Sequence, residues 1–221
     1  MEVKLVTVTK GVGKYKGLSF EEIISAIARH GVLKEDNGRL VRYLMDHKHW
    51  SPLEQIHFGF EIETSRAIGR QMLRHKLHVQ EHSQRYSNRV KFEPVELRKE
   101  HPVNRQSSTE VCNPYIMISE EIKAPAGDLI KSLLKETELI YNKLIEAGVS
   151  KESARMILPE CTTTTMTFTG CLRNWLSFLN VRMEKSAQKE IVEIATIIGE
   201  ELEKQMPNIF STIDWRNGLF M

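Results

Sequence analysis

Alternation of apolar and polar residues predicts strands in three parts of the chain. Residues 2–9 alternate and are rich in β-branched side chains, and residues 56–63 alternate without a break. The apolar face of this second segment consists of Ile56, Phe58, Phe60 and Ile62. A third segment, 161–168, is rich in threonine and is therefore expected to be extended.

Apolar residues at helical spacing predict helices over much of the remaining chain. Ser19 is placed to begin a helix that runs to Ala28, with Glu22 at the capping-box position. Further helices are predicted at 38–47, 65–75, 127–147, 150–158, 171–182 and 186–206. Three of these are followed by residues that end helices, namely Gly148, Pro159 and Pro207.

The order of these elements predicts an α+β fold in which helices dominate the C-terminal half. No internal repeat or low-complexity tract divides the chain, so a single domain is expected over residues 1–221. The stretch 91–116 has three prolines among polar runs and is predicted to form loops and short strands, as an excursion from the domain.

Composition is typical of a soluble globular protein and excludes several classes. The 221 residues are 41% hydrophobic and 27% charged, and the net charge is only +2, unlike a generally basic nucleic-acid coat. The three cysteines are an odd number without CxxC spacing, which indicates a reducing compartment. No apolar run reaches membrane-spanning length and no signal peptide is recognised, so we expect a cytoplasmic protein.

Positive charge is concentrated between residues 65 and 89. Arg66, Arg70 and Arg74 fall at i, i+4 and i+8 of the predicted helix, where like charges repel. Glu81 is the only acid in this stretch, so the pattern does not fit a solvated surface that mixes both signs. Arginine donates paired hydrogen bonds to phosphate, and a phosphate-bearing ligand is therefore expected.

Two other interpretations of this stretch remain open from the residues alone. His78 to His82 reads HxxEH, a zinc-hydrolase pattern in which two histidines lie one helical turn apart. The basic stretch 66–89 also suits a nucleic-acid-binding module, whose binding would collapse with salt. A second group of arginines, Arg155, Arg173 and Arg182, is either part of an anion site or paired with glutamates of the next helix.

Several motifs resemble the flavin-dependent thymidylate synthases. The signature of that family is Arg-His-Arg, seven residues and then Ser, and here Arg74-His75-Lys76 is followed by Ser83. The segment 49–54 resembles the family's His-x-Ser/Thr-x-x-Glu motif. Three later motifs follow in the family order, at 154–159, 172–182 and 187–191. The resemblance spans roughly residues 40 to 195.

The chain departs from the family pattern at three places. Lys76 replaces the third signature residue and loses the bidentate fork of arginine. Only six residues, instead of seven, separate Lys76 from Ser83. Cys171 and Ser177 stand where the family usually has an amide or an imidazole.

The resemblance implies an FAD-dependent methyltransferase that converts dUMP to dTMP. It implies 5,10-methylenetetrahydrofolate as the carbon donor and NADPH as the reductant acting through FAD. It further implies the family's own fold, an antiparallel or mixed sheet with flanking helices, and a homotetramer with active sites at subunit interfaces. No nucleic-acid or membrane partner is expected. Hydroxymethylation of the pyrimidine at C5 remains an alternative reaction.

Matching positions give the expected site residues. The dUMP-binding residues are expected to be Gln71, Arg74, Glu81, His82, Ser83, Gln84, Arg85, Arg155 and Arg182. The FAD-binding residues are expected to be Ser51, Glu54, Arg74, His75, Lys76, Glu81, Cys171, Arg173 and Ser177. Arg182 is the expected catalytic residue, because a cation beside the pyrimidine stabilises negative charge that develops on the ring. No metal is expected.

Overall fold

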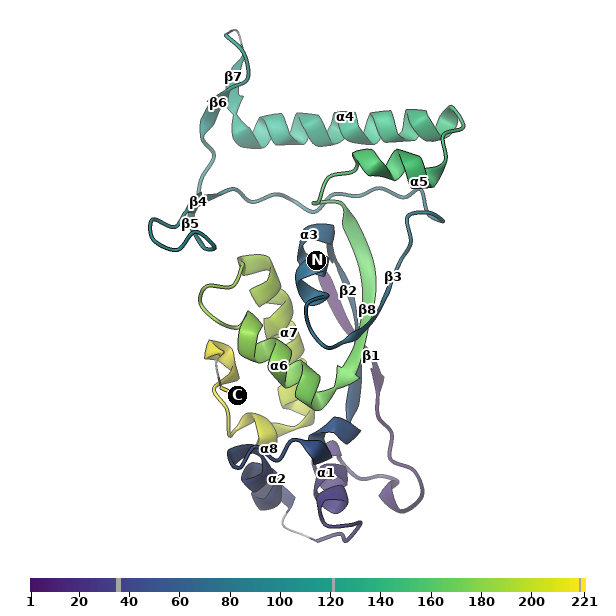
Figure 1. Ribbon diagram of the computed structural model, residues 1–221, viewed down its shortest axis with the longest axis vertical. Coiled ribbons are helices and arrows are strands. Elements are labelled where there is room, and N and C mark those ends of the chain that lie inside the picture. Colours follow the sequence, from purple (N-terminus) through teal and green to yellow (C-terminus); the bar gives the residue numbers. More distant parts are fainter. Residues whose placement is uncertain (35–36, 121, 219) are drawn as a thin grey trace. The chain divides into compact units, whose positions relative to one another are not determined.

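The fold is α+β, as predicted, and its main sheet has four strands. The computed structural model describes residues 1–34, 37–120, 122–218 and 220–221. The strands lie in the order β1 (Glu2–Val8), β2 (His57–Ser65), β8 (Thr163–Cys171) and β3 (His78–Glu81) (Figure 1). The strands expected at 2–9, 56–63 and 161–168 are therefore confirmed, and β3 lies in a segment that the pattern left irregular.

Two further sheets are two-stranded antiparallel hairpins. Strand β4 (Arg98–Glu100) pairs with β5 (Ser108–Val111). Strand β6 (Tyr115–Met117) pairs with β7 (Lys123–Pro125), with Ile116 opposite Ala124. The loops and short strands predicted for 91–116 are confirmed.

The chain packs as two compact units, each assembled from separate segments. The first unit consists of Met1, 63–69 and 81–165, and the second consists of 2–62, 70–80 and 166–221. The single domain expected over the whole chain stays a prediction.

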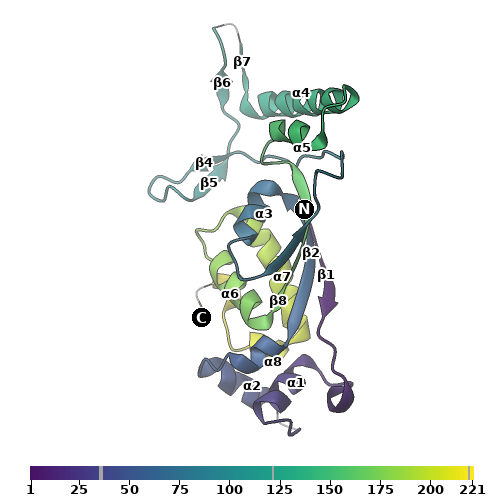
Figure 2. The ribbon, with the colours of Figure 1, turned by 45° about the vertical axis from the view of Figure 1, so that its right-hand side comes forward.

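In the second unit, α1 (Phe20–Ala28) begins as the sequence predicted. The backbone N–H of Glu22 donates to Ser19 Oγ at 3.3 Å, and the backbone N–H of Ser19 donates to the Glu22 carboxylate at 2.8 Å. This reciprocal capping box pairs N–H groups that a helix start leaves unpaired. Helix α1 lies beside α2 (Asn37–Asp46) and α8 (Pro207–Phe210) (Figures 1 and 2).

Helices α6 (Leu172–Arg182) and α7 (Lys189–Gln205) pack together and form the core of the second unit. The buried face of α6 is the one predicted, Leu172, Trp175, Leu176 and Leu179, and each is 0% exposed. Burying a large apolar side chain contributes about 1.5–3 kcal/mol, so this face holds α6 firmly. The indole N–H of Trp175 also donates to the carbonyl of Phe58 on β2 at 3.0 Å.

In the first unit, the long helix α4 (Ala126–Glu146) ends where glycine was expected to stop it. Gly148 has a φ of +84°, a left-handed conformation that favours glycine, and its N–H donates to the carbonyl of Ile145. Helix α5 (Lys151–Ala154) follows alongside α4 in both views (Figures 1 and 2).

The helix predicted at 150–158 is wrong in its length. Only α5 is α-helical, and the chain tightens into a 3₁₀ turn, η3 (Arg155–Ile157), before Pro159. The Ser150 hydroxyl donates to Ser153 Oγ at 3.1 Å and does not cap the backbone. Leu158, the residue before Pro159, is extended (φ −76°, ψ 130°), since the residue before a proline is disfavoured in the α region.

The arginine-rich helix is also shorter than predicted. Helix α3 (Arg66–Met72) ends before Arg74, so the expected stack of three arginines does not form. A turn follows, in which the N–H of His75 donates to the carbonyl of Met72. This turn releases Arg74 and His75 from the helix face.

The other 3₁₀ turns are η1 (Gly13–Tyr15), η2 (Ser51–Gln55) and η4 (Trp215–Asn217). Within the described residues, no helix is both long and apolar enough to cross a lipid bilayer.

Candidate functional site

A polar cavity in the second unit gathers many of the predicted site residues. Its volume is about 690 Å³. It is lined by Glu54, Arg74, His75, Lys76, Arg173, Asn174, Ser177, Val181, Arg182 and Met221. Seven of these were expected to bind FAD, dUMP or both. The turn after α3 supplies 74–76, and α6 supplies the residues from 173 to 182. We call this cavity the arginine pocket.

Arg182, the last residue of α6, is held by three hydrogen bonds. Its Nε–H donates to His75 Nε2 at 2.8 Å, and Nη2 donates to the main-chain carbonyl of Gln71 at 2.9 Å. Nη1 lies 3.4 Å from Gln71 Oε1. None of these acceptors is a carboxylate. The sequence left open an ion pair between Arg182 and a glutamate of the next helix, and these contacts show that Arg182 is held by neutral groups instead.

The pKa values of His75 and Arg182 are both lowered in this environment. Burial, followed by the positive charges of Arg182 and Arg74, lowers the pKa of His75 from 6.5 to about 4. Burial, followed by repulsion from Arg74, lowers the pKa of Arg182. A guanidinium remains charged at neutral pH, whereas His75 is neutral there.

Arg173 is placed differently, because it forms an ion pair with Glu54. Its Nη1 lies 2.5 Å from Glu54 Oε1, and both side chains are partly exposed. This contact joins α6 to η2, two segments that the resemblance assigned to FAD.

Cys171 does not line the arginine pocket, whereas Asn174, three residues later on α6, does. Cys171 is 8% exposed, and both its N–H and its thiol donate to the Asn174 side-chain oxygen, at 3.3 and 2.8 Å. Asn174 lines the arginine pocket, and Cys171 does not. Asn174 was not among the residues expected from the sequence. Its signal was the absence of an amide at 171, with an asparagine three residues later at the first turn of the same helix.

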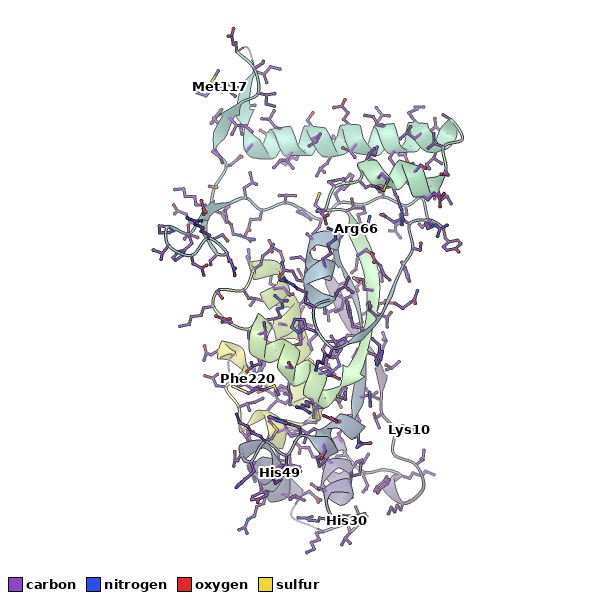
Figure 3. The ribbon with its side chains drawn as sticks, viewed as in Figure 1. Lys10, His30, His49, Arg66, Met117 and Phe220 are labelled. Carbon is purple, nitrogen blue, oxygen red and sulfur yellow. The ribbon has the colours of Figure 1, made fainter. Side chains whose placement is uncertain are left out.

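Ser51 lines a second cavity of the same unit, separate from the arginine pocket. This cavity is about 420 Å³ and is also lined by His49 and apolar residues of α1 and α2. His49 follows α2 (Figure 3) and belongs to a group of exposed rings, in which Tyr43 and His47 stack at 3.9 Å.

The first unit has its own polar cavity, of about 230 Å³. It is lined by Glu63, His82, Ser83, Gln84, Ser87, Arg89, Lys91, Thr163, Thr164 and Thr165. Three of these, His82, Ser83 and Gln84, were expected to bind dUMP. We call this cavity the threonine pocket.

Charged residues around the threonine pocket are largely paired. Lys91 lies 2.5 Å from Glu63, which lowers the pKa of the Glu63 carboxyl chiefly through this hydrogen bond. Arg85, in the next position after Gln84, lies 3.1 Å from Glu152 of α5. Lys91 and Arg85 therefore already have acidic partners.

Two other predicted residues of the first unit, Glu81 and Gln84, accept side-chain hydrogen bonds, and a third, Arg155, is half-buried. Glu81 accepts a hydrogen bond from Thr164 at 2.8 Å. Gln84 accepts one from Arg66, at the start of α3, at 2.7 Å (Figure 3). Arg155 lies half-buried at the end of α5.

The zinc interpretation loses its geometric basis. HxxEH requires a helix to place both histidines on one face, but His78 to Glu81 form strand β3. Among the described residues, no group of three or more His, Cys, Asp or Glu side chains is placed to hold a metal ion.

Comparison with known proteins identifies the family. Residues 14–208 match the Thy1 family, described as "Thymidylate synthase complementing protein". A probable flavin-dependent thymidylate synthase of Paramecium bursaria Chlorella virus 1 is 32% identical, over 97% of this chain and 100% of that protein. The flavin-dependent thymidylate synthase of Synechocystis sp. is 30% identical over the same shares. That of Thermosipho africanus is 33% identical, over 80% of this chain and 76% of its own length.

The family match covers most of the chain, and the two relatives first named are matched from end to end. The motifs that carried the resemblance lie within the matched region. The prediction of the family is therefore confirmed, and the chain belongs to the Thy1 family, that of the flavin-dependent thymidylate synthases.

Proposed function

We propose that this protein is a flavin-dependent thymidylate synthase that methylates dUMP at C5 to give dTMP. The carbon donor is 5,10-methylenetetrahydrofolate, and NADPH reduces the enzyme through FAD. The observation that carries the proposal is Arg182, a charged guanidinium held by neutral acceptors at the edge of a cavity rich in cations. Family membership supports the same reaction.

The donors of the arginine pocket fit a flavin dinucleotide. Arg74 and Lys76 offer charged donors to a diphosphate, and Ser177 and Asn174 offer neutral groups to sugar or ring. Its volume of about 690 Å³ falls in the range of about 300–1,000 Å³ that is usual for cofactor sites. Bound flavin supplies the reducing equivalents that the reaction needs.

Arg182 has donors left for a ligand. A guanidinium carries five N–H groups. Three have partners among the described residues, which leaves two, one on each terminal nitrogen. Two adjacent donors suit the imide edge of uracil, where they stabilise negative charge that develops as C5 becomes nucleophilic. Arg182 cannot accept a proton, so its role is electrostatic.

The residues that bind the dUMP phosphate and sugar are proposed to be those of the 81–85 segment and Arg155. Ser83 and Gln84 line the threonine pocket and carry neutral donors. Arg85 is ion-paired with Glu152, and both side chains are more than half exposed, so the pair is weak enough to exchange for a phosphate. The Ser83 hydroxyl accepts a hydrogen bond from the backbone N–H of Arg85 at 3.3 Å, and Ser83 is proposed as a ligand contact.

Assembly into a homotetramer forms part of this proposal. Helix α4 has 21 residues, of which only Ala126 and Tyr141 are buried. Leu133 and Leu139 on α4 are 59% and 58% exposed, and Met117 on the β6–β7 hairpin is 64% exposed (Figure 3). A monomeric protein rarely leaves so many large apolar side chains in water, which supports contact with further copies.

Purified protein tests the proposal directly. We expect a yellow protein that releases FAD on denaturation and forms dTMP from dUMP only when both methylenetetrahydrofolate and NADPH are present. Product analysis distinguishes dTMP from a hydroxymethylated nucleotide. A colourless protein that FAD does not reconstitute would overturn the proposal. Salt-sensitive binding of DNA or RNA by such a colourless protein would favour the nucleic-acid alternative instead.

A further inference from the structure

The orientation of the Arg182 guanidinium is fixed by hydrogen bonds from two of its nitrogens, Nε and Nη2. Nε–H donates to His75 Nε2 at 2.8 Å and Nη2 donates to the Gln71 carbonyl at 2.9 Å. Both acceptors belong to the end of α3 and the turn that follows it. Two hydrogen bonds on one edge fix the plane of the guanidinium in space, and since Nη1 has a further contact with Gln71 Oε1, one donor on each terminal nitrogen remains for a ligand.

His75 can accept this hydrogen bond only as a neutral imidazole. With Nε2 as the acceptor, the ring proton must be on Nδ1. The surroundings favour this form, because the ring is half-buried, packs edge-on against Phe178 at 5.0 Å, and lies beside Arg74 and Arg182. A protonated ring would direct a second donor at the Arg182 donor.

We propose that His75 is a positioning residue for the methylation step, and that its neutral Nε2 orients the guanidinium of Arg182 towards the pyrimidine. This inference rests on the proposed function of Arg182 and adds a role for His75 beside its expected contact with FAD. The acceptor atom at the Nε2 position is the feature that matters.

A neutral acceptor has an advantage over a carboxylate at this position. Arg173 and Arg216 are held by Glu54 and Glu203, and each carboxylate neutralises the charge that it orients. His75 and the Gln71 carbonyl orient Arg182 and leave its full positive charge for the ligand. Electrostatic stabilisation of a transition state requires such a charge, fixed beforehand and not compensated.

Two substitutions at one position separate the acceptor from the rest of the side chain. His75→Leu keeps an apolar body of similar size and removes the acceptor, whereas His75→Gln retains a carbonyl oxygen near the Nε2 position. His57→Leu, an exposed histidine of β2 outside the proposed site, is the matched control. Turnover of dUMP is measured per bound flavin, so that loss of FAD is not mistaken for loss of Arg182 orientation.

We expect His75→Leu to lower kcat by about 10- to 100-fold, since misplacing a catalytic group by about 1 Å costs about 100-fold. The KM for dUMP should change much less, His75→Gln should recover most of kcat, and His57→Leu should match the wild type. Wild-type kcat in His75→Leu would overturn the inference, and so would a His75→Gln variant as impaired as His75→Leu.

A readout without turnover distinguishes this inference from the proposed function. In protein labelled with ¹⁵N-arginine, the Arg182 Nε–H signal should exchange slowly in the wild type and in His75→Gln, and rapidly in His75→Leu. A protected signal in a protein that does not methylate dUMP would support the contact and reject the proposed reaction. A signal that exchanges equally in all three proteins would overturn the inference.

Discussion

The arginine pocket and the threonine pocket treat positive charge in opposite ways. In the arginine pocket, Arg182 is held by the imidazole of His75 and the carbonyl of Gln71, and the positive charge of Arg74 repels that of Arg182. Around the threonine pocket, Arg85 and Lys91 each have a glutamate partner. The charge of Arg182 is therefore left uncompensated by a carboxylate, whereas the charges of Arg85 and Lys91 are balanced by one. The difference teaches that the density of arginines along a chain does not by itself locate the strongest anion site.

The largest effect is expected where charge is uncompensated. Arg182→Ala should reduce dTMP formation by at least about 1,000-fold, since removing a single oxyanion-stabilising donor costs about 100- to 1,000-fold and a whole cation is lost here. FAD should stay bound, because Arg74, Lys76 and Arg173 remain. Flavin absorbance and turnover assays measure both. Simultaneous loss of flavin would show that Arg182 holds the cofactor. Arg216→Ala, which lines neither pocket, is the control.

The next effect is a dependence of stability on pH that arises from His75. Its folded-state pKa of about 4 lies below the unfolded value of 6.5, so the unfolded chain binds more protons between these values. Stability from this group is complete above pH 6.5 and falls as the pH drops to 4, by about 2 kcal/mol after allowance for solvent screening. The charged groups around the ring are Arg182, Arg74, Lys76 and the Arg173–Glu54 pair.

Denaturant unfolding at pH 7 and pH 5 measures this change. His75→Gln removes the titrating group and should flatten the difference, whereas His57→Leu should leave it as in the wild type. An equal pH dependence in the wild type and His75→Gln would locate the titration elsewhere in the chain.

A smaller effect is expected at the balanced charges. Arg85→Ala should raise the KM for dUMP about tenfold, the loss of one charged hydrogen bond to phosphate. Glu152→Gln should change this KM by less than about threefold, since the exposed ion pair is weak. Steady-state kinetics on both variants test the contrast, and a larger effect of Glu152→Gln would show that the pair fixes Arg85 in place.

The smallest effect concerns the pair that forms one wall of the threonine pocket. Lys91→Ala breaks the ion pair with Glu63, in which the two side chains are 58% and 34% exposed. The expected loss in the free energy of unfolding is below about 1 kcal/mol, in the range for exposed pairs. Thermal unfolding in low and high salt measures it. A loss that persists in high salt would mean that Lys91 contributes packing as well as charge.

Periodicity predicted the elements that bury an apolar face, and packing explains why. The capping box of Ser19 and Glu22, the apolar face of α6 and the stop at Gly148 all depend on residues within one or two turns of each other. Local chemistry decides such features. The errors fall where the chain leaves regular structure for the pockets, at the end of α3 and at the early end of α5.

The sequence alone determined the family and the α+β fold, because motif order and side-chain periodicity are properties of the chain itself. Only the tertiary structure decided which arginines are held by neutral groups and which are paired with a carboxylate. Gln71 and His75 are separated from Arg182 by more than 100 residues, and Arg85 from Glu152 by more than 60, so no local pattern could pair them. Whether an arginine has a neutral or an acidic partner depends on which segments the fold brings together. An arginine with neutral partners keeps its charge for a ligand, whereas one paired with a carboxylate has its charge neutralised.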